Sequence, residues 1–121
     1  MDLRLRAVTI DASDPQGLAR FWSDVTGREI ITPMPDLARL ASETPGGPVL
    51  LFLHVPEDKT VKDRIHLDLE TRDQATEVSR VIALGATFHS EVKGSEHQWT
   101  VLQDSERNEF CIIQSAEADP E

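Results

Sequence analysis

Apolar and polar side chains alternate in two segments of the chain, residues 3–13 (LRLRAVTIDAS) and residues 63–73 (DRIHLDLETRD). Successive side chains of a β-strand point to opposite faces, so the alternation predicts a half-buried strand in each segment. In the second segment, one face would carry Ile65, Leu67 and Leu69. The other face would carry a histidine and two carboxylates, His66, Asp68 and Glu70. The pattern alone leaves open whether His66 is a metal ligand, a proton carrier or an ordinary sheet residue.

The segment after the first predicted strand has apolar residues at helical spacing. They are Leu18, Phe21, Trp22 and Val25. Asp14 stands where a helix N-cap is expected, and Pro15 occupies the first helical position. Gly27 follows the last apolar position and is typical of a helix end. These signals predict a helix over residues 15–26.

The segment after the second predicted strand has the same order of signals. Its apolar positions are Ala75, Val78, Val81 and Ile82. Asp73 precedes them as the expected N-cap, and Gly85 follows them as the expected helix end. Each half of the chain is therefore predicted to begin strand, helix, strand.

An offset of 59 residues, the spacing of the two expected N-cap aspartates, aligns the rest of the two halves without a gap. It places Ala7 on His66 and Phe52 on Cys111. It also places the segment TPGGPVLLFLHV on QDSERNEFCIIQ. We interpret the chain as two copies of a strand-helix-strand-strand-strand unit.

The chain of 121 residues is short enough to form one domain, residues 1–121, and long enough to bury a core. The repeat divides this domain into a first module of about residues 1–60 and a second of about residues 61–121. Residues 56–64 (PEDKTVKDR) are charged and lack apolar periodicity, so we interpret them as the linker between the halves.

Charge narrows the range of partners. The formal net charge is −10, with 22 acidic and 12 basic residues, which disfavours binding to nucleic acid or an anionic membrane and favours cationic small molecules. A single cysteine excludes an intrachain disulfide. No segment has the pattern of a signal peptide or the roughly 20 apolar residues of a membrane span. These features predict a cytoplasmic protein.

Four segments together resemble the vicinal oxygen chelate superfamily, which includes glyoxalase I, extradiol dioxygenases, fosfomycin-resistance enzymes and bleomycin-resistance proteins. They are residues 8–27, 64–73, 81–86 and 99–113, and their order and spacing cover nearly the whole chain. The resemblance implies an α+β fold of two tandem βαβββ modules, whose curved mixed sheets surround a cavity, in a protein that is usually dimeric. The closing hairpin has Arg107 where the family usually has glycine.

The resemblance also implies where a metal would bind, because metal-dependent relatives take two ligands from each module. Those positions fall on Ala7, about Phe52, His66 and Cys111. A catalytic divalent site needs about three protein ligands, and methyl and phenyl groups supply no lone pair. We therefore expect no metal and no other cofactor, with one alternative left open, a rearranged set of His66, Cys111 and Glu109.

The resemblance implies a small-molecule pocket lined by Trp22, Phe52, His66, Trp99 and Cys111. Trp22 would reach the mouth of the cavity, and Trp99 would be either core or cavity wall. His66 would be a core histidine, the polar anchor of a ligand, or a general acid or base. Cys111 has no basic neighbour in sequence that would favour a thiolate, so we interpret it as a packed thiol.

Two functional classes follow from these residues. In the first, the protein is a homodimer that binds a cationic or planar compound without the usual metal ligand set, as bleomycin-resistance proteins do. In the second, it is a lyase or dioxygenase-like enzyme, in which His66 carries a proton or a rearranged metal site acts as a Lewis acid. The sequence leaves both open and does not identify the ligand.

Overall fold

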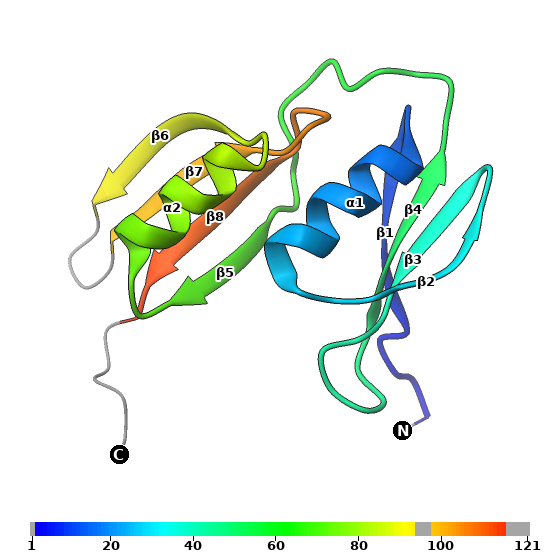
Figure 1. Ribbon diagram of the computed structural model, residues 1–121. Helices are drawn as coiled ribbons and strands as arrows, with labels where there is room; N and C mark the ends of the chain where they lie inside the picture. Colours follow the sequence, from blue (N-terminus) through cyan, green and yellow to red (C-terminus); the bar gives the residue numbers. More distant parts are fainter. Residues whose placement is uncertain (1, 94–97, 116–121) are drawn as a thin grey trace. The chain divides into compact units, whose positions relative to one another are not determined.

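A computed structural model of the chain describes residues 2–93 and 98–115, with the backbone alone at residues 32 and 33. The chain forms two compact units, residues 1–58 and 59–121 (Figure 1). Each unit holds one four-stranded sheet and one helix, in the order strand, helix, strand, strand, strand. The expected α+β class and the two tandem βαβββ modules are therefore confirmed. Within the described residues, neither helix has the length and apolar character needed to cross a membrane.

The first module contains five elements. They are β1 (Ala7–Ala12), α1 (Pro15–Thr26), β2 (Ile30–Met34), β3 (Leu37–Leu40) and β4 (Val49–His54). The strand order is β1-β4-β3-β2, with β1 parallel to β4 and the other pairs antiparallel. As predicted, the side chain of Asp14 caps α1 by accepting the Gly17 N–H at 3.0 Å, and Gly27 ends it in a left-handed conformation.

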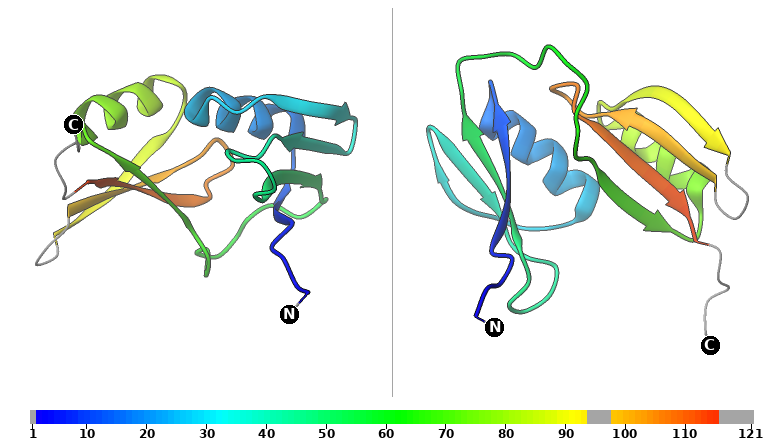
Figure 2. Two further views of the ribbon diagram at one scale, coloured as in Figure 1. Left: turned by 90° about the horizontal axis from the view of Figure 1, so that it is seen from below. Right: turned by 180° about the vertical axis from the view of Figure 1, so that it is seen from behind.

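The core of the first module lies between α1 and one face of its sheet. Figure 2 shows from two sides how the helix lies along that sheet. The helix contributes mainly Leu18, Ala19, Phe21, Trp22 and Val25. The strands contribute Ala38, Leu40, Leu50 and Phe52. Because these strand residues alternate with less buried ones, one face of the sheet is covered by α1 and the other is not.

The second module repeats this plan. Its elements are β5 (Leu67–Thr71), α2 (Gln74–Ala83), β6 (Thr87–Lys93), β7 (Gln98–Gln103) and β8 (Glu109–Gln114). The strand order is β5-β8-β7-β6, with β5 parallel to β8. Its core includes Val81, Ala86, Leu102, Phe110 and Ile112. The predicted strand over residues 63–73 is shorter than expected, since β5 begins at Leu67 and His66 stands immediately before it.

Equivalent residues of the two modules are separated by 59 positions in the first strands and by 60 in the last strands. The Val55 N–H donates to the Ala12 carbonyl at 2.9 Å, and the equivalent bond runs from the Ser115 N–H to the Thr71 carbonyl at 2.7 Å. The acceptors are 59 residues apart, whereas the donors are 60 apart. The last strands are therefore displaced by one residue from the single offset that the sequence suggested.

This displacement corrects the expected equivalence of Phe52 and Cys111. With an offset of 60, Cys111 corresponds to Leu51. Phe52 is fully buried, and its register partner Ala38 on β3 is fully buried as well. A shift of one residue moves a strand side chain to the opposite face, so Phe52 belongs to the core under α1.

The predicted linker includes residues that are anchored to the second module through the buried carboxylate of Glu109. That carboxylate accepts the Asp63 N–H at 2.7 Å, Lys59 Nζ at 3.0 Å and Gln103 Nε2 at 3.3 Å. The Glu109 N–H donates in return to Asp63 Oδ2 at 3.0 Å. This part of residues 56–64 is thus fastened to the first residue of β8.

The contacts shift the pKa values of Glu109 and Asp63 in opposite directions. Burial raises the pKa of Glu109, but hydrogen bonds from the Asp63 N–H, Lys59 and Gln103 outweigh burial and lower it overall. Burial, together with the negative charge of Glu109, raises the pKa of Asp63. Glu109 is therefore the member of this pair that the fold holds in its ionised form.

The turn between β7 and β8 forms without a glycine. Asp104 Oδ1 accepts the N–H groups of Glu106 at 2.9 Å and Asn108 at 3.0 Å, and the Arg107 N–H donates to the Asp104 carbonyl at 2.9 Å. Arg107 adopts φ of 69°, the left-handed conformation that a side chain disfavours. A glycine would adopt this turn conformation without strain. Here the hydrogen bonds to the carboxylate of Asp104 hold the turn instead.

Candidate functional site

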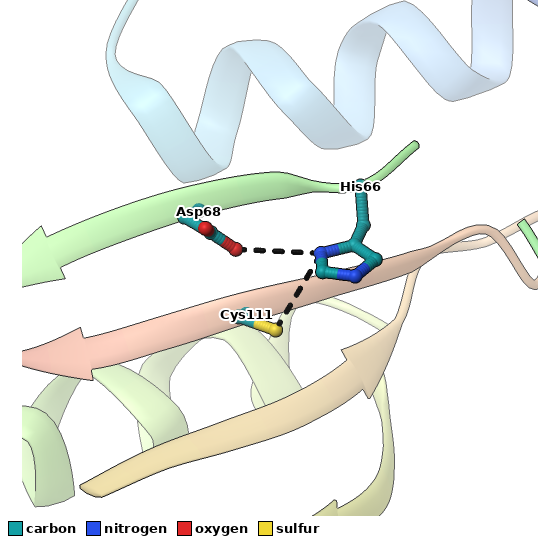
Figure 3. A group of neighbouring side chains, drawn as sticks. All are labelled: His66, Asp68 and Cys111. Atoms are coloured by element: carbon teal, nitrogen blue, oxygen red, sulfur yellow. Dashed lines mark hydrogen bonds and ion pairs between the residues drawn. The ribbon is translucent and has the colours of Figure 1, made fainter. Parts of the chain in front are cut away.

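Three side chains with different donor atoms meet on the sheet of the second module (Figure 3). His66 precedes β5, Asp68 lies on β5, and Cys111 is the register partner of Asp68 on β8. His66 Nδ1 is 3.4 Å from Asp68 Oδ1 and 3.9 Å from Cys111 Sγ. All three donor atoms lie within 4.8 Å of one another. We call these residues the His-Asp-Cys cluster.

The cluster has a buried end and an open end. Cys111 is 3% exposed, whereas the side chains of His66 and Asp68 are 42% and 54% exposed. Burial, together with the negative charge of Asp68, raises the pKa of the Cys111 thiol to about 11. A thiol with this pKa is protonated at neutral pH and is a poor nucleophile. Without a bound metal, Cys111 is therefore a buried, protonated thiol.

Asp68 gives His66 the orienting partner that the sequence did not show. Figure 3 shows Nδ1 of the imidazole turned toward Asp68 and Cys111, and the other ring nitrogen turned away from them. A carboxylate beside one ring nitrogen fixes the orientation of the ring and leaves the other nitrogen to exchange a proton or bind a ligand. At 3.4 Å, the contact with Asp68 is at the long end for a hydrogen bond.

Trp99 shares the sheet face of the cluster. On β7 it pairs with Ile113, and Val101, two residues further along β7, pairs with Cys111. Residues two apart on a strand share a face, so Trp99, Val101 and Cys111 all project from the side opposite the buried Phe110. Trp99 is half-buried.

The two predicted pocket residues of the first module lie in its core. Trp22 is 1% exposed and packs edge to face on Phe21, with ring centroids 5.6 Å apart. We expected Trp22 to reach a cavity mouth, but its position among the buried residues of α1 places it in the helix-sheet core instead. Phe52 is also in that core for the register reason given above. The structure thus brings together His66 and Cys111 only, with Trp99 on the same face.

The profile of the glyoxalase-like domain family matches residues 7–113. The chain belongs to the glyoxalase-like family. No curated protein matches it in sequence. The resemblance to the vicinal oxygen chelate superfamily is confirmed by this match and by the solved structures described next.

Solved structures with the glyoxalase-like fold cover nearly all of the chain. A glyoxalase/bleomycin resistance protein/dioxygenase family enzyme from Burkholderia phytofirmans PsJN is 22% identical, over 92% of this chain and 98% of that one, with a TM-score of 0.76. The fosfomycin resistance protein FosX of Listeria monocytogenes, in complex with Mn(II) and a dihydroxypropylphosphonic acid, is 14% identical, over 95% and 92%, with a TM-score of 0.79. A lactoylglutathione lyase from Agrobacterium tumefaciens is 15% identical, over 91% and 92%, with a TM-score of 0.66.

The residues of this glyoxalase-like chain do not fit the ligand arrangement that the superfamily resemblance implies. With the corrected register, the two positions in the first module are Ala7 and Leu51, and neither side chain has a donor atom. Glu109, the substitute carboxylate we considered, is buried and accepts three hydrogen bonds as described above. Of the four positions at which the superfamily resemblance implies metal ligands, only His66 and Cys111 have a donor atom, and both belong to the second module.

Asp68 is the site residue that the sequence reasoning did not assign to chemistry. Its signal was present, because alternation places Asp68 on the same strand face as His66. The missing information was the pairing of β5 with β8, which sets Asp68 directly opposite Cys111. A pairing between strands so far apart in sequence is not encoded in either strand's own pattern.

Proposed function

We propose that this glyoxalase-like protein binds a small organic molecule on the exposed sheet face of its second module, without the usual metal ligand set. The observation that supports this proposal most is the orientation of His66, whose ring contacts Asp68 through one nitrogen while the other points away from Asp68 and Cys111. The His66 side chain is 42% exposed. His66 is the polar anchor, and Trp99, on the same face, supplies a flat apolar surface. Trp22 and Phe52 act indirectly, as core residues that support the fold.

The charge of the protein favours a cationic or planar ligand. The net charge is −10, and the face that carries His66 also carries the exposed carboxylates of Asp68 and Glu70. Negative charge beside the site attracts cations, and an indole binds cations and planar rings through its face. The bleomycin-resistance proteins among the superfamily members offer a parallel for sequestering such a compound.

The proposal predicts that ligand affinity depends on His66 and Trp99. In calorimetric titrations with bleomycin and with the planar cation acridine orange, Trp99→Ala should weaken binding by about 1–3 kcal/mol, the usual contribution of an aromatic contact with cation–π character. His66→Ala should weaken it by about 1 kcal/mol, the usual contribution of one hydrogen bond.

His89→Ala is the matched control, because His89 is an exposed histidine on β6 that contacts Ser90 and lies outside the cluster. This variant should bind as the parent protein does. Unchanged affinity in both His66→Ala and Trp99→Ala, together with a lower melting temperature, would show instead that the two residues serve stability alone.

A second function, catalysis with His66 as proton carrier, is supported by the contact between His66 and Asp68. A carboxylate that orients an imidazole is an arrangement used by general acid–base catalysts. Asp68→Asn separates the two functions. It should leave ligand affinity nearly unchanged if His66 is only an anchor, and it should reduce turnover more than binding if His66 transfers a proton.

We also propose that the protein is a homodimer. Within the described residues, β1 and β2 are the edges of the first sheet and β5 and β6 those of the second, and exposed edges favour pairing with a further chain. Light scattering at micromolar concentration should return about twice the 13.5 kDa mass of the chain. A mass of one chain throughout the micromolar range would rule out this assembly.

A further inference from the structure

We propose that the second module by itself binds one thiophilic divalent cation of the zinc class, through His66 Nδ1, the carboxylate of Asp68 and Cys111 Sγ. The three donors come from the start of β5 and from β8. No residue of the first module takes part. The site therefore differs from the arrangement that the superfamily implies, because Asp68 supplies a donor in place of the two positions held by Ala7 and Leu51.

Two of the three separations between the donor atoms are close to those of a tetrahedral zinc site. With zinc bonds of about 2.0–2.1 Å to nitrogen, 2.0–2.2 Å to oxygen and 2.3 Å to sulfur, tetrahedral angles place nitrogen about 3.4 Å from oxygen and about 3.6 Å from sulfur. His66 Nδ1 is 3.4 Å from Asp68 Oδ1 and 3.9 Å from Cys111 Sγ. Closing the second separation requires a movement of only about 0.3 Å, which an exposed imidazole can make. The third separation, between the Asp68 carboxylate and Cys111 Sγ, is within 4.8 Å and would have to become about 3.6 Å.

The strands set two of the donors before any ion binds. Asp68 and Cys111 are direct register partners in the parallel pair of β5 and β8, so the sheet fixes their Cα positions. His66 stands two residues before Asp68, and residues two apart in an extended segment project from the same face. Sites built on strands hold their ligands more accurately than sites built on loops.

The donor types select the ion. A thiolate and an imidazole favour zinc, cobalt and other thiophilic ions, whereas magnesium, calcium and manganese prefer sets of oxygen ligands. The set of nitrogen, oxygen and sulfur therefore favours a different ion from the Mn(II) found in the FosX complex. Three protein ligands leave a fourth position of a tetrahedral ion for water or for a donor atom of a small molecule.

A metal site at the His-Asp-Cys cluster differs from our expectation of a metal-free protein. That expectation counted His66 and Cys111 as the only usable donors, with Glu109 as the alternative third. Asp68 supplies the third donor, whereas Glu109 is held by Lys59 and Asp63. The inference does not depend on the proposed organic ligand, because a metal titration is carried out without one.

The test is a titration of the 121-residue protein with Co²⁺ after treatment with EDTA. Cobalt reports its ligands directly, since a bound thiolate produces a charge-transfer band in the near ultraviolet. We expect this band to saturate at one Co²⁺ per chain and to be removed by Zn²⁺ but not by a similar concentration of Mn²⁺. We expect Cys111→Ser to abolish the band, and Asp68→Asn and His66→Ala each to weaken cobalt binding by about tenfold or more. His89→Ala, the control, should bind as the parent does.

Asp68→Asn keeps the test decisive even if Cys111→Ser fails to fold, because Asp68 is more than half exposed and its amide is nearly the same size. The inference is wrong if the folded parent shows no charge-transfer band. It is also wrong if the band keeps its strength in both Asp68→Asn and His66→Ala, because the thiol would then bind cobalt without the other two residues. Failure of the bleomycin titration with a positive cobalt titration would remove the proposed ligand and leave the metal site.

Discussion

Replacing Phe52 with alanine should lower the free energy of unfolding by about 3–5 kcal/mol, the usual loss when a buried phenyl ring is removed from a core. Phe52 is 0% exposed, and its register partner Ala38 is fully buried as well. Because the ring is fully enclosed by its neighbours, the variant loses these packing contacts and leaves a cavity. Urea denaturation followed by circular dichroism measures the change.

Leu51→Ala is the matched control, because Leu51 is the adjacent residue of β4 and faces the other side of the sheet. Leu51 is only half-buried, so its loss should cost less, about 1–2 kcal/mol. The comparison also tests the corrected equivalence between Leu51 and Cys111. A Phe52→Ala protein as stable as the parent, but with weaker bleomycin binding, would restore Phe52 as a pocket residue.

Replacing Glu109 with alanine should lower the free energy of unfolding at pH 7 by about 2–4 kcal/mol, because the change leaves partly buried donors without their acceptor. The carboxylate receives the Asp63 N–H at 2.7 Å and Lys59 Nζ at 3.0 Å. Both donors belong to the segment that precedes β5, so the variant should also loosen that segment. Faster hydrogen exchange at the Asp63 amide would report this loosening.

The effect should depend on pH in a defined direction. Because the fold lowers the pKa of Glu109, its contribution to stability is present above its ordinary value of 4.5 and is lost as the pH falls further. Asp63 acts in the opposite sense, since its pKa is raised and its carboxylate opposes folding once ionised. The difference in the free energy of unfolding between the parent and Glu109→Ala should therefore shrink between pH 7 and about pH 3.

Glu70→Ala is the control, because it removes an exposed carboxylate of β5, and it should change stability by less than about 0.5 kcal/mol. A Glu109→Ala protein with the parent's stability at pH 7 would show that the buried carboxylate contributes nothing net.

The sequence by itself determined the elements whose causes are local. Asp14 and Asp73 cap the two helices as predicted, because an N-cap needs only a side-chain oxygen and an N–H three residues away. Alternation gave the strand faces, including the shared face of His66 and Asp68. The order of elements and the superfamily resemblance then indicated two βαβββ modules. These signals act within one element or depend on their order along the chain, so a single sequence carries them.

The tertiary structure decided everything that depended on which strands lie side by side. Strand register is fixed by contacts between distant segments, and a change of one residue moves each side chain to the other face. That is why Phe52, assigned to a pocket from a single offset, lies in the core, and why Asp68 lies opposite Cys111. For the same reason, the anchoring of Lys59 by Glu109, across 50 residues of sequence, followed from no local pattern. From its sequence, a charged segment is predicted to lie in solvent. Only the folded structure shows that a buried carboxylate contacts it.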